Sequence, residues 1–345
     1  MHKVLPIIVF VFFTCNAGAQ SYIGQQTLEL YDQSRSRPVI TEIWYPSYKA
    51  PIEADVKFKT PFVRETTTRN APLPEKKLSL IMLSHGTGGG RLTLEWLAAG
   101  LVKQGYMVAA VDHWGNTFDN KIPEQFLKFW ERPKDISFAI TALLSDDKIG
   151  QAIDKERIVV AGFSLGGFTA IALSGGMLDY EQLMAFTDSE KGEKEADIPE
   201  LHDLPDLLKN EAFMEKLLEE YKNSGSLADH RIKATLAIAP ALGQGFKNEE
   251  QVRSINIPVF IIGAEGDEMA PVETNAAHYH QLIEGSGFFL FEGEVGHYVF
   301  LNEINVPMEG DAAIFFGDHA TVDRNQVHQK TIGLSTAFFE KSLKD

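Results

Sequence analysis

RIVVAGFSLGGFTAIALSG, residues 157–175, is the stretch that decides the fold class of this chain. Its first part is apolar and rich in β-branched residues, which is typical of a buried strand, and its last part predicts a helix. Between them, GFSLG matches the G-x-S-x-G pattern, in which a serine occupies a tight turn from strand to helix. Gly162 and Gly166 allow the two backbones to pass closely. The pattern indicates Ser164 as a nucleophile; the alternative is an ordinary glycine-rich turn.

Strand and helix patterns alternate on both sides of this stretch. Continuous apolar runs suit strands that are buried on both faces, and such runs alternating with helices predict an α/β fold with a mostly parallel sheet. Residues 22–31 and 37–45 predict two antiparallel strands, and residues 47–77 form a polar connection. The other expected strands are 78–83, 106–112, 157–162, 234–240, 258–264 and 288–293, and the other expected helices are 91–105, 133–144 and 325–342.

Residues 178–232 break this alternation and are predicted to form a helical lid inserted into one α/β domain, 20–345. The insertion is charged and contains helical stretches such as LLKNEAFMEKLLEEYK. Its aromatic residues either cover an apolar acyl chain or pack the lid onto the domain. These residues are Tyr180, Phe186, Phe213 and Tyr221.

A serine hydroxyl needs a neighbouring base, and His297 is the candidate. It follows the strand 288–293 in a loop that begins at Gly293, and from there it can reach the serine. His113 follows a buried strand and either shapes the site or is structural, and His85 belongs to a glycine-rich loop. The remaining histidines are expected at the surface: His202, His230, His278, His280, His319 and His328.

The base in turn needs an acid that orients it and stabilises its charged form. In G-x-S-x-G hydrolases the chain order is serine, acid, histidine. Asp267 directly follows the strand 258–264 and is the preferred acid; Glu265 is a local rival and Glu268 a weaker one. The alternative reading is that Asp267 merely caps the next helix.

Backbone N–H groups are expected to form the oxyanion hole. One is that of Leu165, directly after the nucleophile, and the other is that of Thr87 in the loop SHGTGGG, residues 84–90. This loop lacks the Gly-Lys-Ser/Thr ending of a phosphate-binding loop and is not G-x-G-x-x-G. Neither a cofactor nor a metal site is expected, since no H-E-x-x-H and no cysteine cluster is present.

The first residues predict export. A short polar start is followed by an apolar run from Val4 to Phe13, about half the length of a membrane span, so stable membrane insertion is not expected. Ala17-Gly18-Ala19 resembles a signal-peptide cleavage site. We therefore expect a periplasmic or secreted protein that begins at Gln20; lipoprotein attachment at Cys15 is the less favoured alternative.

The net charge of −16 over 345 residues argues against nucleic acid and anionic membranes as partners. A hydrophobic content of 44% is sufficient for a full buried core. The expected partner is a small-molecule or lipid ester, and the oligomeric state is left open by the sequence.

With these residues placed, the chain from about Tyr22 onward resembles the bacterial predicted dienelactone hydrolase family, which is related to platelet-activating-factor acetylhydrolases. The motifs that carry the resemblance are Arg37, Trp44-Tyr45-Pro46, Leu83-Ser84-His85-Gly86, Val111-Asp112-His113, Arg132-Pro133-x-Asp135, Gly162-x-Ser164-x-Gly166-Gly167, Asp267-x-x-x-Pro271 and Gly296-His297-Tyr298-x-Phe300. The resemblance implies an α/β-hydrolase fold with the triad Ser164, Asp267 and His297.

Two departures limit what the resemblance implies about the substrate. In the acetylhydrolases the acid lies one strand earlier, where this chain has Ala239-Pro240 and no carboxylate. True dienelactone hydrolases use a cysteine nucleophile, whereas this chain has serine. Arg132 and Asp135 are interpreted as an ion pair or a helix-start contact that supports the fold.

The expected activity is hydrolysis of a short-chain acyl ester through an acyl-enzyme. A phospholipid acetylhydrolase-like activity is the alternative for the substrate, and amidase or acyltransferase activity is the alternative for the reaction. A non-catalytic binding protein on the same scaffold is less favoured, because every member of the triad is present.

Overall fold

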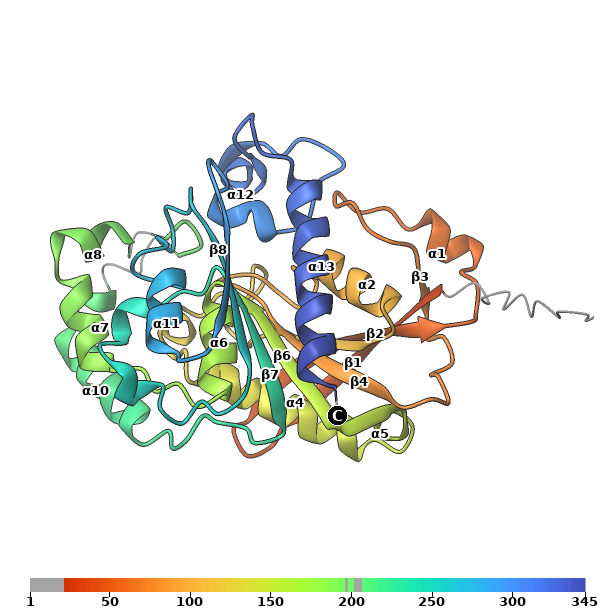
Figure 1. Cartoon of the computed structure of the whole chain (residues 1–345), viewed down its shortest axis with the longest axis horizontal. Coiled ribbons are helices and arrows are strands. Elements are labelled where there is room, and N and C mark those ends of the chain that lie inside the picture. The colour runs from red at the N-terminus through yellow and green to blue at the C-terminus, as the bar shows by residue number, and fades with distance from the viewer. Residues whose placement is uncertain (1–21, 196–197, 202–206, 345) are drawn as a thin grey trace, which may run out of the picture.

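A nine-stranded, mostly parallel sheet forms the centre of the molecule (Figure 1). The computed structural model describes residues 22–195, 198–201 and 207–344. The strands lie in the order β3-β1-β2-β5-β4-β6-β7-β8-β9. The strands are β1 (Tyr22–Asp32), β2 (Arg37–Ser47), β3 (Thr67–Arg69), β4 (Leu78–Ser84), β5 (Met107–Val111), β6 (Ile153–Phe163), β7 (Ile232–Ile238), β8 (Val259–Ala264) and β9 (Gly287–Phe291).

The pairing of the strands confirms the predicted fold class. β1 and β2 form the antiparallel hairpin, and β2 is antiparallel to β5. From β5 onward the strands β5, β4, β6, β7, β8 and β9 are parallel to one another. One strand was missed: β3 lies within the supposed polar connection 47–77 and pairs with β1. Its three residues are too few to produce a recognisable alternation in the sequence.

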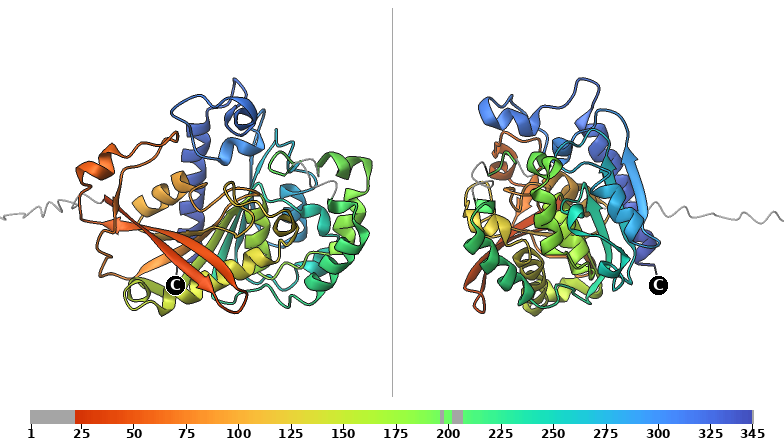
Figure 2. Two further views of the ribbon diagram at one scale, coloured as in Figure 1. Left: turned by 180° about the vertical axis from the view of Figure 1, so that it is seen from behind. Right: turned by 90° about the vertical axis from the view of Figure 1, so that its left-hand side faces the viewer.

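Helices cover both faces of the sheet (Figures 1 and 2). On one face α2 (Glu95–Lys103) and α13 (Arg324–Ser342) pack against the strands. On the other face lie α4 (Glu131–Ser145), α6 (Leu165–Leu173) and α11 (Ala276–Leu282). Every residue of α6 is buried, which explains its almost wholly apolar and small-residue sequence.

The predicted insertion is helical and lies at one end of the molecule (Figure 1). It contains α7 (Tyr180–Thr187), α8 (Glu190–Glu195) and α10 (Glu211–Lys222). The side chains of Asp179 and Asn210 accept backbone N–H bonds at the starts of α7 and α10. The remaining short elements are α1 (Glu53–Lys57), α3 (Pro123–Leu127), α5 (Ile149–Ala152), α12 (Ala313–Phe316), η1 (Gly243–Gly245), η2 (Glu249–Gln251), η3 (His297–Phe300) and η4 (Gly310–Ala312).

His328 is not at the surface, so the sequence-based prediction for this residue was wrong. It lies on α13, is only 2% exposed, and stacks on Trp96 with a ring separation of 3.7 Å. Its Nε2 lies 2.8 Å from the carbonyl oxygen of Val299, and burial lowers its pKa to about 4. The polar sequence of α13 concealed this inward-facing position. His202 lies outside the described residues.

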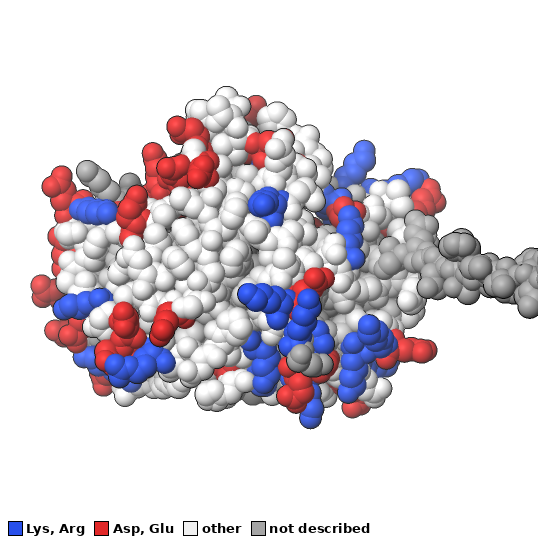
Figure 3. All heavy atoms as spheres, viewed as in Figure 1, with Lys and Arg blue, Asp and Glu red and all other residues white. Residues whose placement is uncertain are grey.

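On the face shown in Figure 3, Lys and Arg gather with some acidic residues at the lower right, Asp and Glu gather at the upper left, and the area between them is largely uncharged. Within residues 22–195, 198–201 and 207–344, no helix combines the length and the apolar character that crossing a membrane requires. The predicted signal peptide and Cys15 lie outside the described residues.

Close backbone packing at the turn after β6 leads to a prediction about stability. A Cβ on Gly166 would overlap the carbonyl oxygen of Ser84 on the neighbouring strand. We expect Gly166→Ala to lower the free energy of unfolding by about 3 kcal/mol. The added Cβ would clash with a backbone atom, which cannot move aside as the end of a flexible side chain could. Urea denaturation followed by circular dichroism measures the change.

Gly333→Ala is the matched control. Gly333 lies in α13, and an added Cβ there meets nothing within 4 Å. This substitution should stabilise the helix by roughly 1 kcal/mol. Equal stabilities of the Gly166 variant and the wild type would contradict the close approach of the two backbones.

Candidate active site

Ser164 occupies a strained turn between β6 and α6. Its φ of 56° and ψ of −121° lie in a region that residues with a side chain rarely adopt. The turn is held by the Ser164 N–H, which donates to the carbonyl oxygen of Ile238 at 2.9 Å. A Cβ on Gly162 would overlap the carbonyl oxygen of Gly166, so the glycines of the pattern are required sterically. The serine is 7% exposed.

The structure brings the three predicted residues of the triad together. The Nε2 of His297 lies 2.9 Å from the Oγ of Ser164, and its Nδ1 lies 2.6 Å from Oδ2 of Asp267. The carboxylate accepts a hydrogen bond from the N–H at Nδ1. The other ring nitrogen, Nε2, therefore carries no proton and can accept a hydrogen bond from the serine hydroxyl. The residues follow β6, β8 and β9, whose carboxyl ends meet at one edge of the sheet.

The geometry distinguishes Asp267 from its two rivals. Its second oxygen, Oδ1, accepts the backbone N–H groups of Met269 at 3.0 Å and Ala270 at 2.7 Å. Asp267 thus contacts His297 through one oxygen and caps the next turn through the other, so capping accounts for only part of its contacts. Glu265 is exposed and accepts the N–H of Gly293 instead, and Glu268 is also exposed.

Both predicted oxyanion donors lie beside the serine. Leu165 and Thr87 line the same cavity as Ser164 and His297. Leu165 is the first residue of α6, where the N–H groups have no partner within the helix. A Cβ on Gly86 would come within 3.2 Å of the Cβ of Ser164, so the loop 84–90 passes directly over the nucleophile.

The cavity at Ser164 has a volume of about 160 Å³ and lies beneath the lid. The lid aromatics divide between the cavity and the packing of the lid onto the domain. Tyr180 and Phe186 line the cavity, whereas Tyr221 donates to the carbonyl oxygen of Leu178 and packs near Trp130. Other apolar lining residues are Phe126, Leu127, Phe129, Leu183, Met184, Ile198, Leu208, Leu242 and Met269.

Glu200 is a residue of this cavity that the sequence did not reveal. It is half-buried, and its Oε1 accepts the hydroxyl of Tyr298 at 3.0 Å. Burial raises the pKa of its carboxyl, and burial likewise raises the pKa of Glu195, which also lines the cavity. Glu200 lies in an insertion without a recognisable motif, so no sequence signal could have found it.

Arg132 and Asp135 have partners other than those expected. Asp135 binds Arg37 and His113, and Arg132 donates to the carbonyl oxygen of His85. Of the two expectations, the direct ion pair does not form, because the start of α4 directs the two side chains to different neighbours. The other, a contact at the helix start that supports the fold, agrees with these bonds. His113 is fully buried and does not line the cavity at Ser164.

Within the part of the chain that the structure describes, no group of three or more His, Cys, Asp or Glu residues could hold a metal ion. The described candidate site brings together a serine, an imidazole and a carboxylate, beside the two residues predicted to supply backbone N–H groups. This set of groups can perform acyl transfer without any other component.

No protein-family model and no curated protein matches the chain. Among solved structures, it is similar to a ferulic acid esterase from Streptomyces cinnamoneus, with a TM-score of 0.60 and 20% sequence identity over 93% of this chain and 90% of that one. At this identity the likeness shows the fold alone, which is the α/β-hydrolase fold. One fold supports many reactions, so the activity depends on the residues of the site rather than on the fold.

Proposed function

We propose that this chain is a serine hydrolase that cleaves carboxylic esters. The observation that carries the proposal is the contact of His297 with Ser164 at 2.9 Å on one ring nitrogen and with Asp267 at 2.6 Å on the other. The contact occurs beside a mostly apolar cavity, where a substrate carbonyl has access to the serine.

The mechanism follows from the proton positions. Ser164 Oγ attacks the ester carbonyl while His297 Nε2 takes the hydroxyl proton, and Asp267 stabilises the resulting imidazolium. The Leu165 and Thr87 N–H groups hold the negative oxygen of the tetrahedral intermediate. His297 returns the proton to the departing alcohol, and the same groups then activate water to release the acid from the acyl-enzyme.

A short acyl group fits the cavity best. Its volume of about 160 Å³ is small beside the roughly 300–1,000 Å³ of sites that hold drug-sized ligands. A phospholipid with a short or oxidised acyl chain is the second candidate, supported by the resemblance to the acetylhydrolases and by the apolar lid. The similar solved structure is by its name an esterase, which supports ester chemistry in general.

Other reactions use the same groups. Amide cleavage and acyl transfer to an alcohol share the acyl-enzyme and differ only in the leaving group or the acceptor. A purely binding role is less well supported, because a serine held by a base in a strained turn is unnecessary for binding. We further propose that the protein acts outside the cytoplasm after cleavage near Ala19.

The proposed function is tested with p-nitrophenyl esters whose acyl chains range from two to twelve carbons, together with the corresponding anilides. We expect turnover of the esters, with the highest kcat/KM for the shortest chains and a steep fall with length. Absence of ester turnover, combined with no labelling by a fluorophosphonate probe, would refute the proposal. Faster cleavage of the anilides would instead indicate an amidase.

The acidic groups in the cavity predict discrimination against anionic substrates. The described lining contains Glu195 and Glu200 but no Lys or Arg. Glu200→Gln should raise the kcat/KM of a hemisuccinate ester relative to the butyrate ester of the same alcohol by about fivefold, because one like-charge repulsion of roughly 1 kcal/mol is removed. Both substrates are measured at pH 8.

The matched control is Glu181→Gln, an exposed lid residue that pairs with Lys222 at 2.8 Å and does not line the cavity. It should leave the ratio of the two esters unchanged. In the wild type, the discrimination should weaken as the pH falls toward the raised pKa of Glu200, because the protonated acid repels no anion. Equal ratios in both variants would contradict the prediction.

A further inference from the structure

Several residues of the resemblance motifs that the proposed mechanism does not use converge at one place, behind the loop 84–90. Arg37 comes from β2, His113 from the segment after β5, and Arg132 and Asp135 from the start of α4. They are buried, with exposures of 5%, 0%, 1% and 0% respectively. A buried charged group is costly unless it has hydrogen-bond or ion-pair partners. The partners of these four residues therefore show which segment the cluster fixes in place.

A chain of hydrogen bonds runs through the cluster to the first residue of the loop. Asp135 accepts two bonds from the Arg37 guanidinium, at 2.8 and 3.0 Å. The Nδ1 of His113 lies 2.9 Å from Oδ2 of Asp135, and its Nε2 lies 2.9 Å from Oγ of Ser84. Asp135 therefore keeps the proton of His113 on Nδ1 and leaves Nε2 to accept the Ser84 hydroxyl.

This second Ser-His-Asp arrangement is not another nucleophilic site. Ser84, His113 and Asp135 are each fully buried, and none of them lines the cavity at Ser164. Burial lowers the pKa of His113 well below its ordinary value, which keeps the ring neutral. A neutral, fixed imidazole that contacts no substrate can act only by holding its neighbours in place.

His85, the next residue of the loop, is held from three sides. Arg132 donates to its carbonyl oxygen, and the N–H of His113 donates to its Nε2 at 3.2 Å. Its Nδ1 lies 2.6 Å from the carbonyl oxygen of Gly86 and donates to it. The two contacts of the ring nitrogens require a single orientation of the His85 ring, and the Arg132 contact fixes its backbone.

The far end of the loop is held in the same way. The N–H of Gly88 donates to Oδ1 of Asn116 at 2.8 Å, and the N–H of Arg91 donates to Oδ1 of Asp112 at 2.6 Å. Thr87 thus lies between anchored residues on both sides. Asn116 and Asp112 belong to the same segment after β5 as His113, so one segment anchors both halves of the loop.

We propose that this network, the chain Arg37–Asp135–His113–Ser84 together with Arg132 and His85, fixes the direction of the Thr87 N–H toward the oxyanion. Asp135 is then a positioning residue, which acts through His113 and the loop. An oxyanion donor must lie within about 2.7–3.1 Å of the developing charge, and a displacement of about 1 Å can cost roughly a hundredfold in rate. The inference rests on the proposed hydrolase function.

Asp135→Asn tests the inference with an isosteric change. The amide can donate to Nδ1 of His113 and thereby reverses the tautomer, so that Nε2 no longer accepts the Ser84 hydroxyl. We expect kcat for a short-chain p-nitrophenyl ester to fall by about 10- to 100-fold, with KM changed by less than about twofold. The inhibition constant of a trifluoromethyl ketone, whose serine adduct carries the oxyanion, should rise by the same factor as kcat falls.

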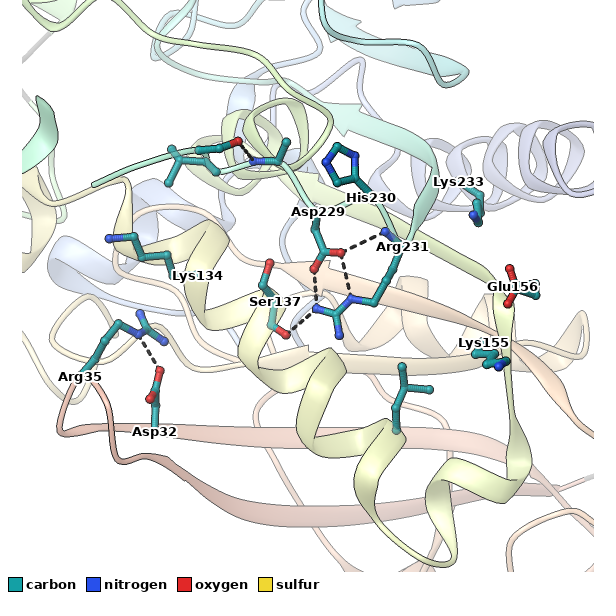
Figure 4. A pocket seen from close by; sticks show the side chains of 14 residues that line it. Asp32, Arg35, Lys134, Ser137, Lys155, Glu156, Asp229, His230, Arg231 and Lys233 are labelled. Atoms are coloured by element: carbon teal, nitrogen blue, oxygen red, sulfur yellow. Dashed lines mark hydrogen bonds and ion pairs between the residues drawn. The ribbon is translucent and has the colours of Figure 1, made fainter. Parts of the chain in front are cut away.

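Asp229→Asn is the matched control. Asp229 pairs with Arg231 in a surface groove of about 770 Å³, which shares no lining residue with the cavity at Ser164 (Figure 4). This variant also loses an aspartate–arginine pair, but it should keep kcat, KM and the inhibition constant. Thermal unfolding of each variant is measured to check that it is folded at the assay temperature.

Ser84→Ala is the second variant. If Asp135→Asn is insoluble, this variant tests whether the network positions the loop 84–90. It removes only the hydroxyl that joins the loop to His113, and a smaller fall in kcat, about three- to tenfold, is expected. Unchanged kcat and ketone inhibition in the soluble variants would overturn the positioning role while leaving the hydrolase proposal intact. A wild-type protein without turnover and without probe labelling would overturn both.

Discussion

Ser164→Ala is expected to abolish ester turnover, with kcat reduced by about 10⁴- to 10⁶-fold. The alanine has no oxygen with which to form the acyl-enzyme, and His297 then has no proton to remove. What remains is binding in the cavity and the oxyanion hole, which by themselves give only weak catalysis. Steady-state assays with a short-chain p-nitrophenyl ester measure the loss, and a fluorophosphonate probe should label the wild type but not this variant.

Ser174→Ala is the control for this substitution. Ser174 follows α6 and is buried, with its hydroxyl donating to the carbonyl oxygen of Ala170 at 2.9 Å. It belongs to the same structural region, yet it should retain both turnover and labelling. Equal labelling of Ser164→Ala and the wild type would show that another residue is the nucleophile.

Asp267→Asn is expected to have the second-largest effect, a fall in kcat of roughly 10³- to 10⁴-fold. An amide at this position can donate to Nδ1 of His297, which places the imidazole proton on Nε2. His297 then cannot accept the proton of Ser164, although the ring remains in place. The rate of fluorophosphonate labelling should fall together with kcat, since labelling requires the same proton transfer.

The control for Asp267 is its nearest rival in the sequence. Glu265→Gln changes an exposed side chain that accepts the Gly293 N–H and does not contact His297. Turnover within about twofold of the wild type is expected. If Glu265→Gln were the inactive variant and Asp267→Asn the active one, the assignment of the acid would have to be reversed.

Much of the architecture was determined by local patterns in the chain. Each buried parallel strand is a continuous apolar run, and the turn after β6 needs glycine on both sides of Ser164 for steric reasons. In a parallel sheet the carboxyl ends of the strands meet at one edge, so His297 after β9 and the acidic residues after β8, with Asp267 preferred, could be named as candidates. These features are local in sequence or follow from a general rule of topology.

The cavity was determined only by long-range contacts. Glu200 meets Tyr298, 98 positions along the chain, and nothing near Glu200 in the sequence indicates that it lies at the site. The sequence around His328 is polar and predicted a surface position, whereas the packing of α13 places its ring against Trp96. The partners of Asp135 are likewise distant: Arg37 is 98 positions away and His113 is 22 positions away.

The sequence by itself therefore determined the α/β class, the serine turn and the candidates for base, acid and oxyanion hole. Only the tertiary structure decided which carboxylate meets His297, what lines the cavity, and what holds the loop over Ser164. The physical reason is the range of the interactions. Strand periodicity and glycine requirements act between neighbours in the chain, whereas hydrogen bonds among buried polar groups join segments that only folding brings together.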